Sequence, residues 1–155
     1  MSQWVVLMHV ASAFWLVSGL VGRDVTLRQA RKATDIKLIT ELAGRFDRFA
    51  VVPGSIVVFF MGLITAWVQG RPFTGSGNWW LLSSLLLYLT LLPLVPFVFL
   101  PRGKVFDQAL KDAIEEGAVT SELTAAFDEP TVRATRTYER LVIAVVLALM
   151  ITKPF

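Results

Sequence analysis

One side chain in this sequence combines a reactive group with an unusual setting: His9, the only histidine of the 155 residues. It lies in an apolar run, residues 3–22, that contains no other ionisable side chain. An imidazole in such surroundings is a metal or haem ligand, a group that handles protons, or a hydrogen-bonded structural residue. His9 is therefore the first candidate for chemistry in this chain.

The rest of the composition removes several kinds of chemistry. The chain has no cysteine, so disulfides, iron–sulfur clusters and thiolate metal sites are excluded. A hydrolytic zinc site needs about three protein ligands, which one histidine without cysteine does not supply inside a membrane. The apolar segments carry no Asp, Glu, Lys or Arg away from their ends, whereas proton-coupled transport usually needs such a residue at depth. The chemistry that remains possible is that of a single imidazole and its neighbours.

Haem b is the cofactor that this imidazole suits best. We predict that His9 is a ligand of the haem iron, because imidazole is a strong axial ligand, and that the thioether of Met61 is the second one. Gly62 would let the macrocycle approach the helix backbone, and Arg71 or Lys153 would pair with its propionates.

Two alternatives for His9 stay open. One is a Cu(I) site in which Met8, Met61 and Met150 add thioether ligands to the imidazole. The other is a neutral His9 without a ligand, hydrogen-bonded to Ser12, to a neighbouring helix or to water. The second alternative needs fewer assumptions than either metal site.

The hydropathy pattern predicts an all-α, polytopic membrane protein: a bundle of four transmembrane helices in one integral membrane domain, residues 1–155. With 55% hydrophobic residues and a mean hydropathy of +0.62, the chain is too apolar for an ordinary soluble domain. About 20 apolar residues, rising 1.5 Å each, cross a hydrocarbon core of about 30 Å. Four segments qualify, the last with a helix start at Asp128 and Pro130. They cover residues 3–22, 49–68, 79–100 and 135–152.

Thirteen of the 15 Lys and Arg residues lie in or beside two predicted loops, residues 23–48 and 101–134. Because basic residues concentrate on the cytoplasmic side, we predict a multi-pass protein of the bacterial plasma membrane with both termini on the outer side. The net charge of +3 then faces anionic lipid head groups, so we expect contact with membrane lipid and no nucleic acid. A homo-oligomer and a membrane protein partner both stay open.

Both cytoplasmic loops are predicted to be helical. Loop 23–48 has no proline and one glycine, Gly44. Loop 101–134 has apolar residues at helical spacing that end before Gly117, and a second short helix from about Ser121 to Phe127. The apolar residues of its first helix are Phe106, Leu110, Ala113 and Ile114.

Two further groups of residues carry a predicted role. Gly19 and Gly22, with Ser18, are typical of a close contact between membrane helices. Charged residues lie at the ends of three of the spans. There they either form a ring that binds an anion or extend to lipid head groups. These residues are Arg23, Asp24, Arg45, Asp47, Arg48, Arg136, Glu139 and Arg140.

The first span resembles the opening of several four-helix bacterial membrane families, at Leu7-Met8-His9, Trp15 and Gly19-Leu20. Together with the motifs Arg45-Phe46-Asp47-Arg48, Pro53-Gly54 and Met61-Gly62, the chain most resembles an uncharacterised bacterial family of predicted four-helix integral membrane proteins, a domain of unknown function. This resemblance covers most of the chain and implies its fold and its membrane location.

More distantly, the first span is similar to HemJ-type protoporphyrinogen oxidases and CopD-type membrane proteins. In those families a histidine at this place in the first helix is implicated in haem or metal binding, which implies such a role for His9. The chain lacks the second histidine of a bis-histidine site.

These patterns lead to an integral membrane protein that binds haem through His9 in a redox or electron-transfer role, and is at most a haem-dependent membrane oxidoreductase. The alternatives are a non-catalytic structural or assembly subunit of a membrane complex and a component of a small-molecule or metal permease.

Overall fold

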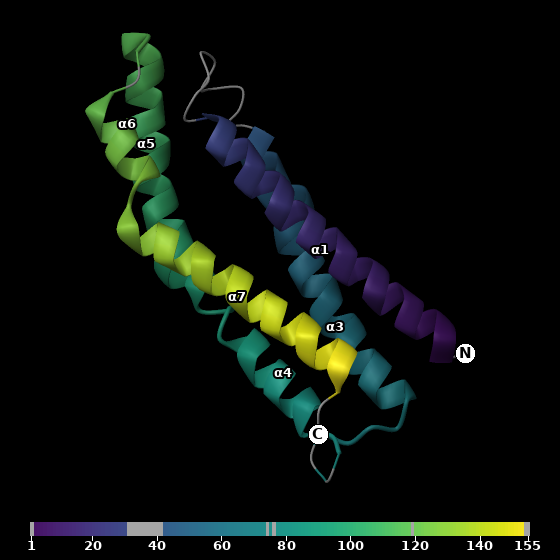
Figure 1. The fold of residues 1–155 in the computed structure, drawn as a ribbon. Helices are drawn as coiled ribbons and strands as arrows, with labels where there is room; N and C mark the ends of the chain where they lie inside the picture. The colour runs from purple at the N-terminus through teal and green to yellow at the C-terminus, as the bar shows by residue number, and fades with distance from the viewer. Residues whose placement is uncertain (1, 31–41, 74, 76, 119, 154–155) are drawn as a thin grey trace. The chain divides into compact units, whose positions relative to one another are not determined.

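Helices form every described element of this chain. The structure is a computed structural model that describes residues 2–30, 42–73, 75, 77–118 and 120–153. Over these residues the elements are α-helices and two π-helical turns, which confirms the predicted all-α class (Figure 1). The chain divides into two compact units, Met1–Pro72 and Phe73–Phe155. The prediction of a single domain stays a prediction.

The first unit is an antiparallel pair of long helices (Figure 1). The helix α1 runs from Ser2 to Ala30. The second helix runs from Leu42 to Val68 and contains the π-helical turn η1 (Asp47–Val51) and α3 (Val52–Val68). Both are long and apolar enough to cross a membrane, and they contain the predicted spans 3–22 and 49–68. The helix predicted for loop 23–48 is present up to Ala30; residues 31–41 lie outside the described residues.

The π-helical turn η1 has a local cause in Pro53. At the end of η1 the backbone N–H of Val52 donates to the carbonyl of Asp47, five residues back instead of four. Pro53 has no N–H to donate, and its ring crowds the carbonyl four residues before it. The wider turn relieves this conflict without ending the helix.

Small residues bring the two helices of the first unit into close contact. A Cβ atom at Gly19 would lie 2.6 Å from the Cβ of Ala50, and one at Gly54 would lie 3.2 Å from the Cα of Leu16. Carbon atoms do not approach this closely without displacing each other, so only glycine fits at Gly19. Close approach of backbones is how helices gain packing energy in lipid, where no hydrophobic effect drives them together.

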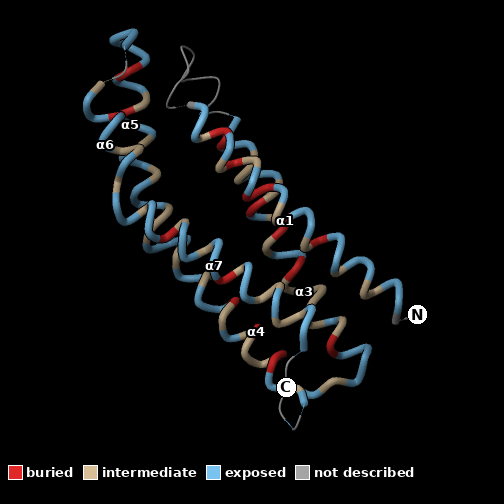
Figure 2. The backbone as a smooth tube through the Cα atoms, viewed as in Figure 1, coloured by how far each residue is buried: buried red, intermediate tan, exposed pale blue. Residues whose placement is uncertain are grey.

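The contact continues along both helices. Gly22 faces the ring of Phe46, whose Cε1 would be 2.5 Å from an added Cβ. The predicted contact at Gly19 and Gly22 is therefore confirmed, while Ser18 lies on the exposed side of α1. Figure 2 shows the buried residues of both helices recurring along their lengths, separated by exposed ones.

The second unit contains five helical elements. They are α4 (Trp79–Leu89), the π-helical turn η2 (Val95–Phe99), α5 (Leu100–Glu116), α6 (Ser121–Phe127) and α7 (Pro130–Thr152). The helix α4 packs against α7, and α6 packs against α5. The phenol of Tyr138 on α7 shares a hydrogen bond of 2.7 Å with the hydroxyl of Thr90, just after α4.

The helix of the third predicted span, residues 79–100, is interrupted. The α-helix α4 ends at Leu89, and residues 90–93 form turns before η2 begins at Val95. Pro93 and Pro96 cause the break, because each removes one backbone N–H and clashes with the preceding turn. By itself α4 rises only about 16 Å, less than a bilayer core.

The helices predicted in loop 101–134 are confirmed. Gly117 ends α5 in the left-handed conformation, with φ of 67°, and Thr120 caps α6 by accepting a hydrogen bond from the N–H of Leu123. The side chain of Leu123 is completely buried between the two helices. The rings of Phe106 and Phe127 pack edge to face, 5.0 Å apart.

The helix α7 begins at Pro130, as predicted, but its cap is Glu129 and not Asp128. One carboxylate oxygen of Glu129 accepts a hydrogen bond of 2.8 Å from the N–H of Val132. The other lies 2.9 Å from the guanidinium of Arg102 at the start of α5. This carboxylate therefore holds the first turn of α7 next to the start of α5.

Two described helices meet the length and composition of a membrane span, both in the first unit. In the second unit α4 is too short alone, and α7 carries three arginines and a glutamate in its first half. Four transmembrane helices stay a prediction.

Gly19→Ala tests the contact between α1 and η1. The added Cβ would collide with Ala50, so we expect the free energy of unfolding to fall by about 1–3 kcal/mol. Gly44→Ala is the matched control. Among the described residues, no atom outside its own helix backbone lies within 4 Å of a Cβ there, so stability should stay constant or rise by up to about 1 kcal/mol. Reversible unfolding in detergent measures both, and equal effects would contradict the contact.

Candidate functional site

The imidazole of His9 packs against the backbone of α3. A Cβ atom at Gly62 would lie 3.3 Å from Cε1 of the ring, and 3.8 and 3.9 Å from its two nitrogens. The ring therefore turns the edge that carries both nitrogens towards α3. The space at Gly62, which we predict from the sequence to admit a haem macrocycle, is occupied by the imidazole itself in the structure.

The polar groups around His9 leave one ring nitrogen without a partner. Nδ1 is buried and makes no hydrogen bond among the described residues. The hydroxyl of Ser12 donates to the backbone carbonyl of His9 at 2.7 Å and not to the ring. The backbone of Val58 on α3 is a hydrogen-bond partner of the imidazole ring, whereas Nδ1 keeps no described partner. A buried polar atom without a partner costs about 1–3 kcal/mol, so Nδ1 calls for a partner other than these groups.

Met61 points to another side of α3 than Gly62 does. It directly precedes Gly62, and adjacent residues of an α-helix point about 100° apart. Its side chain is half-buried, and its carbonyl accepts a hydrogen bond of 2.6 Å from the hydroxyl of Thr65. The structure thus brings His9 to Gly62, and Met61 as a second iron ligand stays a prediction.

The two cations suggested for haem propionates have other neighbours. Arg71 donates from Nε to the side-chain carbonyl of Gln69 at 3.0 Å. Lys153 belongs to the second unit, where its ammonium lies 5.8 Å from the centre of the Trp80 ring. Of the two, only Arg71 shares a unit with His9.

A buried ion pair lies on the same helix contact, towards the end of α1. The side chain of Arg23 is only 4% exposed, and its Nη1 lies 3.1 Å from a carboxylate oxygen of Asp47 in η1. Asp24 adds a second carboxylate at 3.5 Å from Nε. Arg23 is thus held between two carboxylates rather than extended towards lipid head groups. The sequence placed these residues at the ends of two spans, and the antiparallel pairing joins them.

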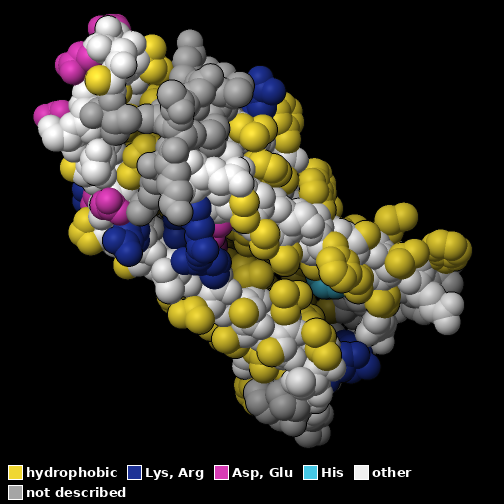
Figure 3. Space-filling model, turned by 45° about the horizontal axis from the view of Figure 1, so that its top comes forward, with side chains coloured by type: hydrophobic (Ala, Val, Ile, Leu, Met, Phe, Trp, Pro, Cys, Tyr) yellow, Lys and Arg dark blue, Asp and Glu magenta, His cyan; other side chains and the backbone are white. Residues whose placement is uncertain are grey.

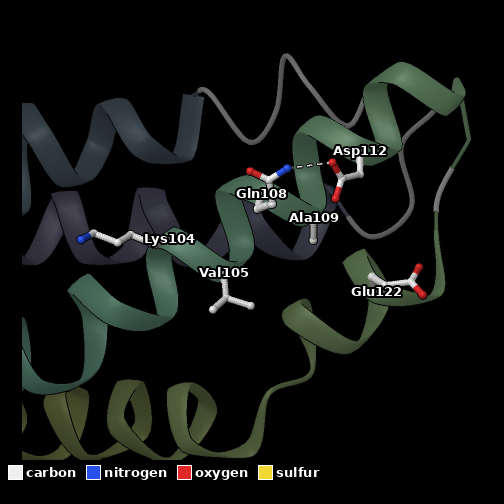
Figure 4. Close-up of a pocket in the computed structure, with 6 residues that line it drawn as sticks. All are labelled: Lys104, Val105, Gln108, Ala109, Asp112 and Glu122. Atoms are coloured by element: carbon white, nitrogen blue, oxygen red, sulfur yellow. Dashed lines mark hydrogen bonds between the residues drawn. The ribbon is translucent and has the colours of Figure 1, made fainter.

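A shallow, open groove lies between α5 and α6 (Figure 4). The amide of Gln108 donates a hydrogen bond of 2.9 Å to the carboxylate of Asp112, so these two polar side chains of α5 are partners of each other. In Figure 4 the side chains of Lys104 and Glu122 stand at opposite ends of the groove and do not converge. Among the described residues no three His, Asp or Glu side chains gather as metal ligands. This groove therefore lacks the convergent groups of a binding site.

Asp47→Asn tests the buried ion pair. It removes one of the two described carboxylates beside Arg23, so we expect the free energy of unfolding to fall by about 1–2 kcal/mol, since Asp47 is half exposed. Arg48→Gln changes the neighbouring exposed charge and should stay within about 0.5 kcal/mol of the wild type. A double-mutant cycle with Arg23→Gln measures the coupling, and strictly additive effects would show that the pair contributes nothing.

Comparison with known proteins agrees with the apolar helices of the first unit. No curated protein and no solved structure matches the chain. Residues 3–154 match a family described as a predicted integral membrane protein. Since this match covers nearly the whole chain, the protein belongs to the predicted integral membrane protein family DUF2269.

Proposed function

We propose that this integral membrane protein binds haem b through His9 and transfers electrons. The observation that supports this proposal is the buried Nδ1 of His9, which has no hydrogen-bond partner among the described residues. A polar atom kept in this state inside an apolar helix pair has a cost, and a ligand of the imidazole would offset it. Haem bound by imidazole supplies one-electron redox chemistry.

The residues around His9 suit this role in two respects. His9 is only partly buried, so part of the residue remains accessible. Gly62 has no side chain to hinder a rotation of the imidazole that would turn a nitrogen away from α3. Met61 is the proposed second ligand, and Arg71 is the cation of the same unit for a propionate.

The proposed setting is the bacterial plasma membrane, with both termini on the outer side and His9 in the outer half of the bilayer. The distribution of Lys and Arg supports this orientation.

The second candidate is a non-catalytic subunit of a membrane complex. Large apolar side chains on the outside of α1 and α3 favour it: Trp4, Phe14 and Trp67 are 69%, 69% and 81% exposed. Lipid or a partner helix would cover them. A permease is less well supported within the first unit, where the buried side chains of Leu16 and Leu20 separate the polar groups of Ser12 and Arg23.

An absorbance spectrum of the protein purified from haem-replete cells tests the proposal. We expect a Soret band that His9→Ala abolishes. Met61→Leu should keep haem but lose the six-coordinate, low-spin form, because one ligand is gone. Met8→Leu, at an exposed position of α1, is the control and should leave the spectrum unchanged. A colourless wild type favours the non-catalytic subunit, and full haem content in His9→Ala removes His9 as the ligand.

A further inference from the structure

The first half of α7 carries a line of arginines, which we call the arginine stripe: Arg133, Arg136 and Arg140. Their spacing of three and four residues places them on one face of the helix. Between Pro130 and Arg140 the only acidic residue is Glu139, so this part of the helix has an excess of positive charge. The stripe belongs to the second unit and is independent of His9.

The apolar part of α7 is too short to keep the whole stripe outside a bilayer. From Arg140 to Thr152 the helix rises about 18 Å, against a hydrocarbon core of about 30 Å. If Thr152 lies at one boundary of the core, Arg140 lies inside the core, about 12 Å short of the other boundary. A guanidinium at this depth must reach water or attract an anion.

The side chain of Arg140 is held towards the polar end of α7. Its Nε donates to the carbonyl of Arg136 at 3.2 Å, and its Nη2 donates to the hydroxyl of Thr137 at 3.1 Å. Both acceptors lie in the preceding turn, so the guanidinium points back along the helix, away from the apolar half. The positive charge is thereby gathered at one level of the helix.

Two residues beside Arg136 and Arg140 have features that are typical of a membrane interface. Tyr138 is 41% exposed and shares a hydrogen bond of 2.7 Å with the hydroxyl of Thr90, and tyrosine is enriched at membrane interfaces. The guanidinium of Arg133 is largely exposed, and its contact with Asp128 is long, at 3.7 Å. On the face drawn in Figure 3, Lys and Arg side chains gather in small groups among hydrophobic ones.

We propose that the arginine stripe of α7 binds the phosphate of an anionic phospholipid. Arginine presents N–H donors in a planar fork that matches phosphate oxygens, and adjacent turns of one helix offer several such forks to one head group. The short apolar half of α7 brings the acyl chains alongside the helix while the phosphate meets the stripe. The bound lipid thereby fixes the depth of α7 in the membrane, which the short apolar half of the helix leaves undetermined.

Native mass spectrometry of the full chain, released from nanodiscs of phosphatidylcholine and phosphatidylglycerol, tests this proposal. The wild type should retain phosphatidylglycerol in preference to phosphatidylcholine. Arg136→Gln combined with Arg140→Gln should weaken this retention by about tenfold or more. Lys111→Gln, an exposed cation on α5, is the matched control and should retain the lipid as the wild type does.

A conservative variant covers the case in which the double substitution does not fold. Arg140→Lys keeps the charge but loses the fork, and should reduce retention by about threefold to tenfold with unchanged elution as a single species. Wild-type retention in the double variant, or an equal loss in Lys111→Gln, would overturn the proposal. Displacement of the lipid by inorganic phosphate would also overturn it and assign the stripe to a soluble phosphate.

Discussion

The close packing of α1 on the helix Leu42–Val68 decides where the candidate groups of the first unit lie. Gly19 and Gly54 let the two helix backbones approach closely, and this close approach fixes one register of the helix pair. In that register His9 meets Gly62, and Arg23 meets Asp47. A slip of one residue would turn each side chain by about 100° and separate both pairs at once.

The polar groups on this contact differ at its two ends. At one end, Arg23 is buried but lies between two carboxylates, so its charge is compensated inside the protein. At the other end, the Nδ1 atom of His9 is buried without a described partner. Membrane helices rarely hold a polar group of this kind in their interior, and those that do use it in function as a rule. This difference is why the proposed function rests on His9 and not on the ion pair.

Much of the fold could be predicted from the sequence, because helix starts and ends depend on neighbouring residues. Pro130 starts α7, Gly117 ends α5, and the apolar run 3–22 lies within α1. The direction of the His9 ring was not predictable, because α1 is apolar on all sides over this run and periodicity does not show which face meets another helix. For the same reason Gly62 was assigned to a cofactor when it accommodates the imidazole. The pairing of Arg23 with Asp47 needed the register of two helices that are distant in sequence.

Cysteine cross-linking measures this register most directly, since the natural chain has no cysteine. The Cβ of Leu16 lies 3.4 Å from a Cβ placed at Gly54, close to the separation of about 3.5–4.5 Å found in disulfides. Leu16→Cys combined with Gly54→Cys should therefore form an intramolecular disulfide rapidly in native membranes. The pair Leu16→Cys and Ile64→Cys, about 15 Å out of register along the helix, should not. Preferential oxidation of the second pair would contradict the account.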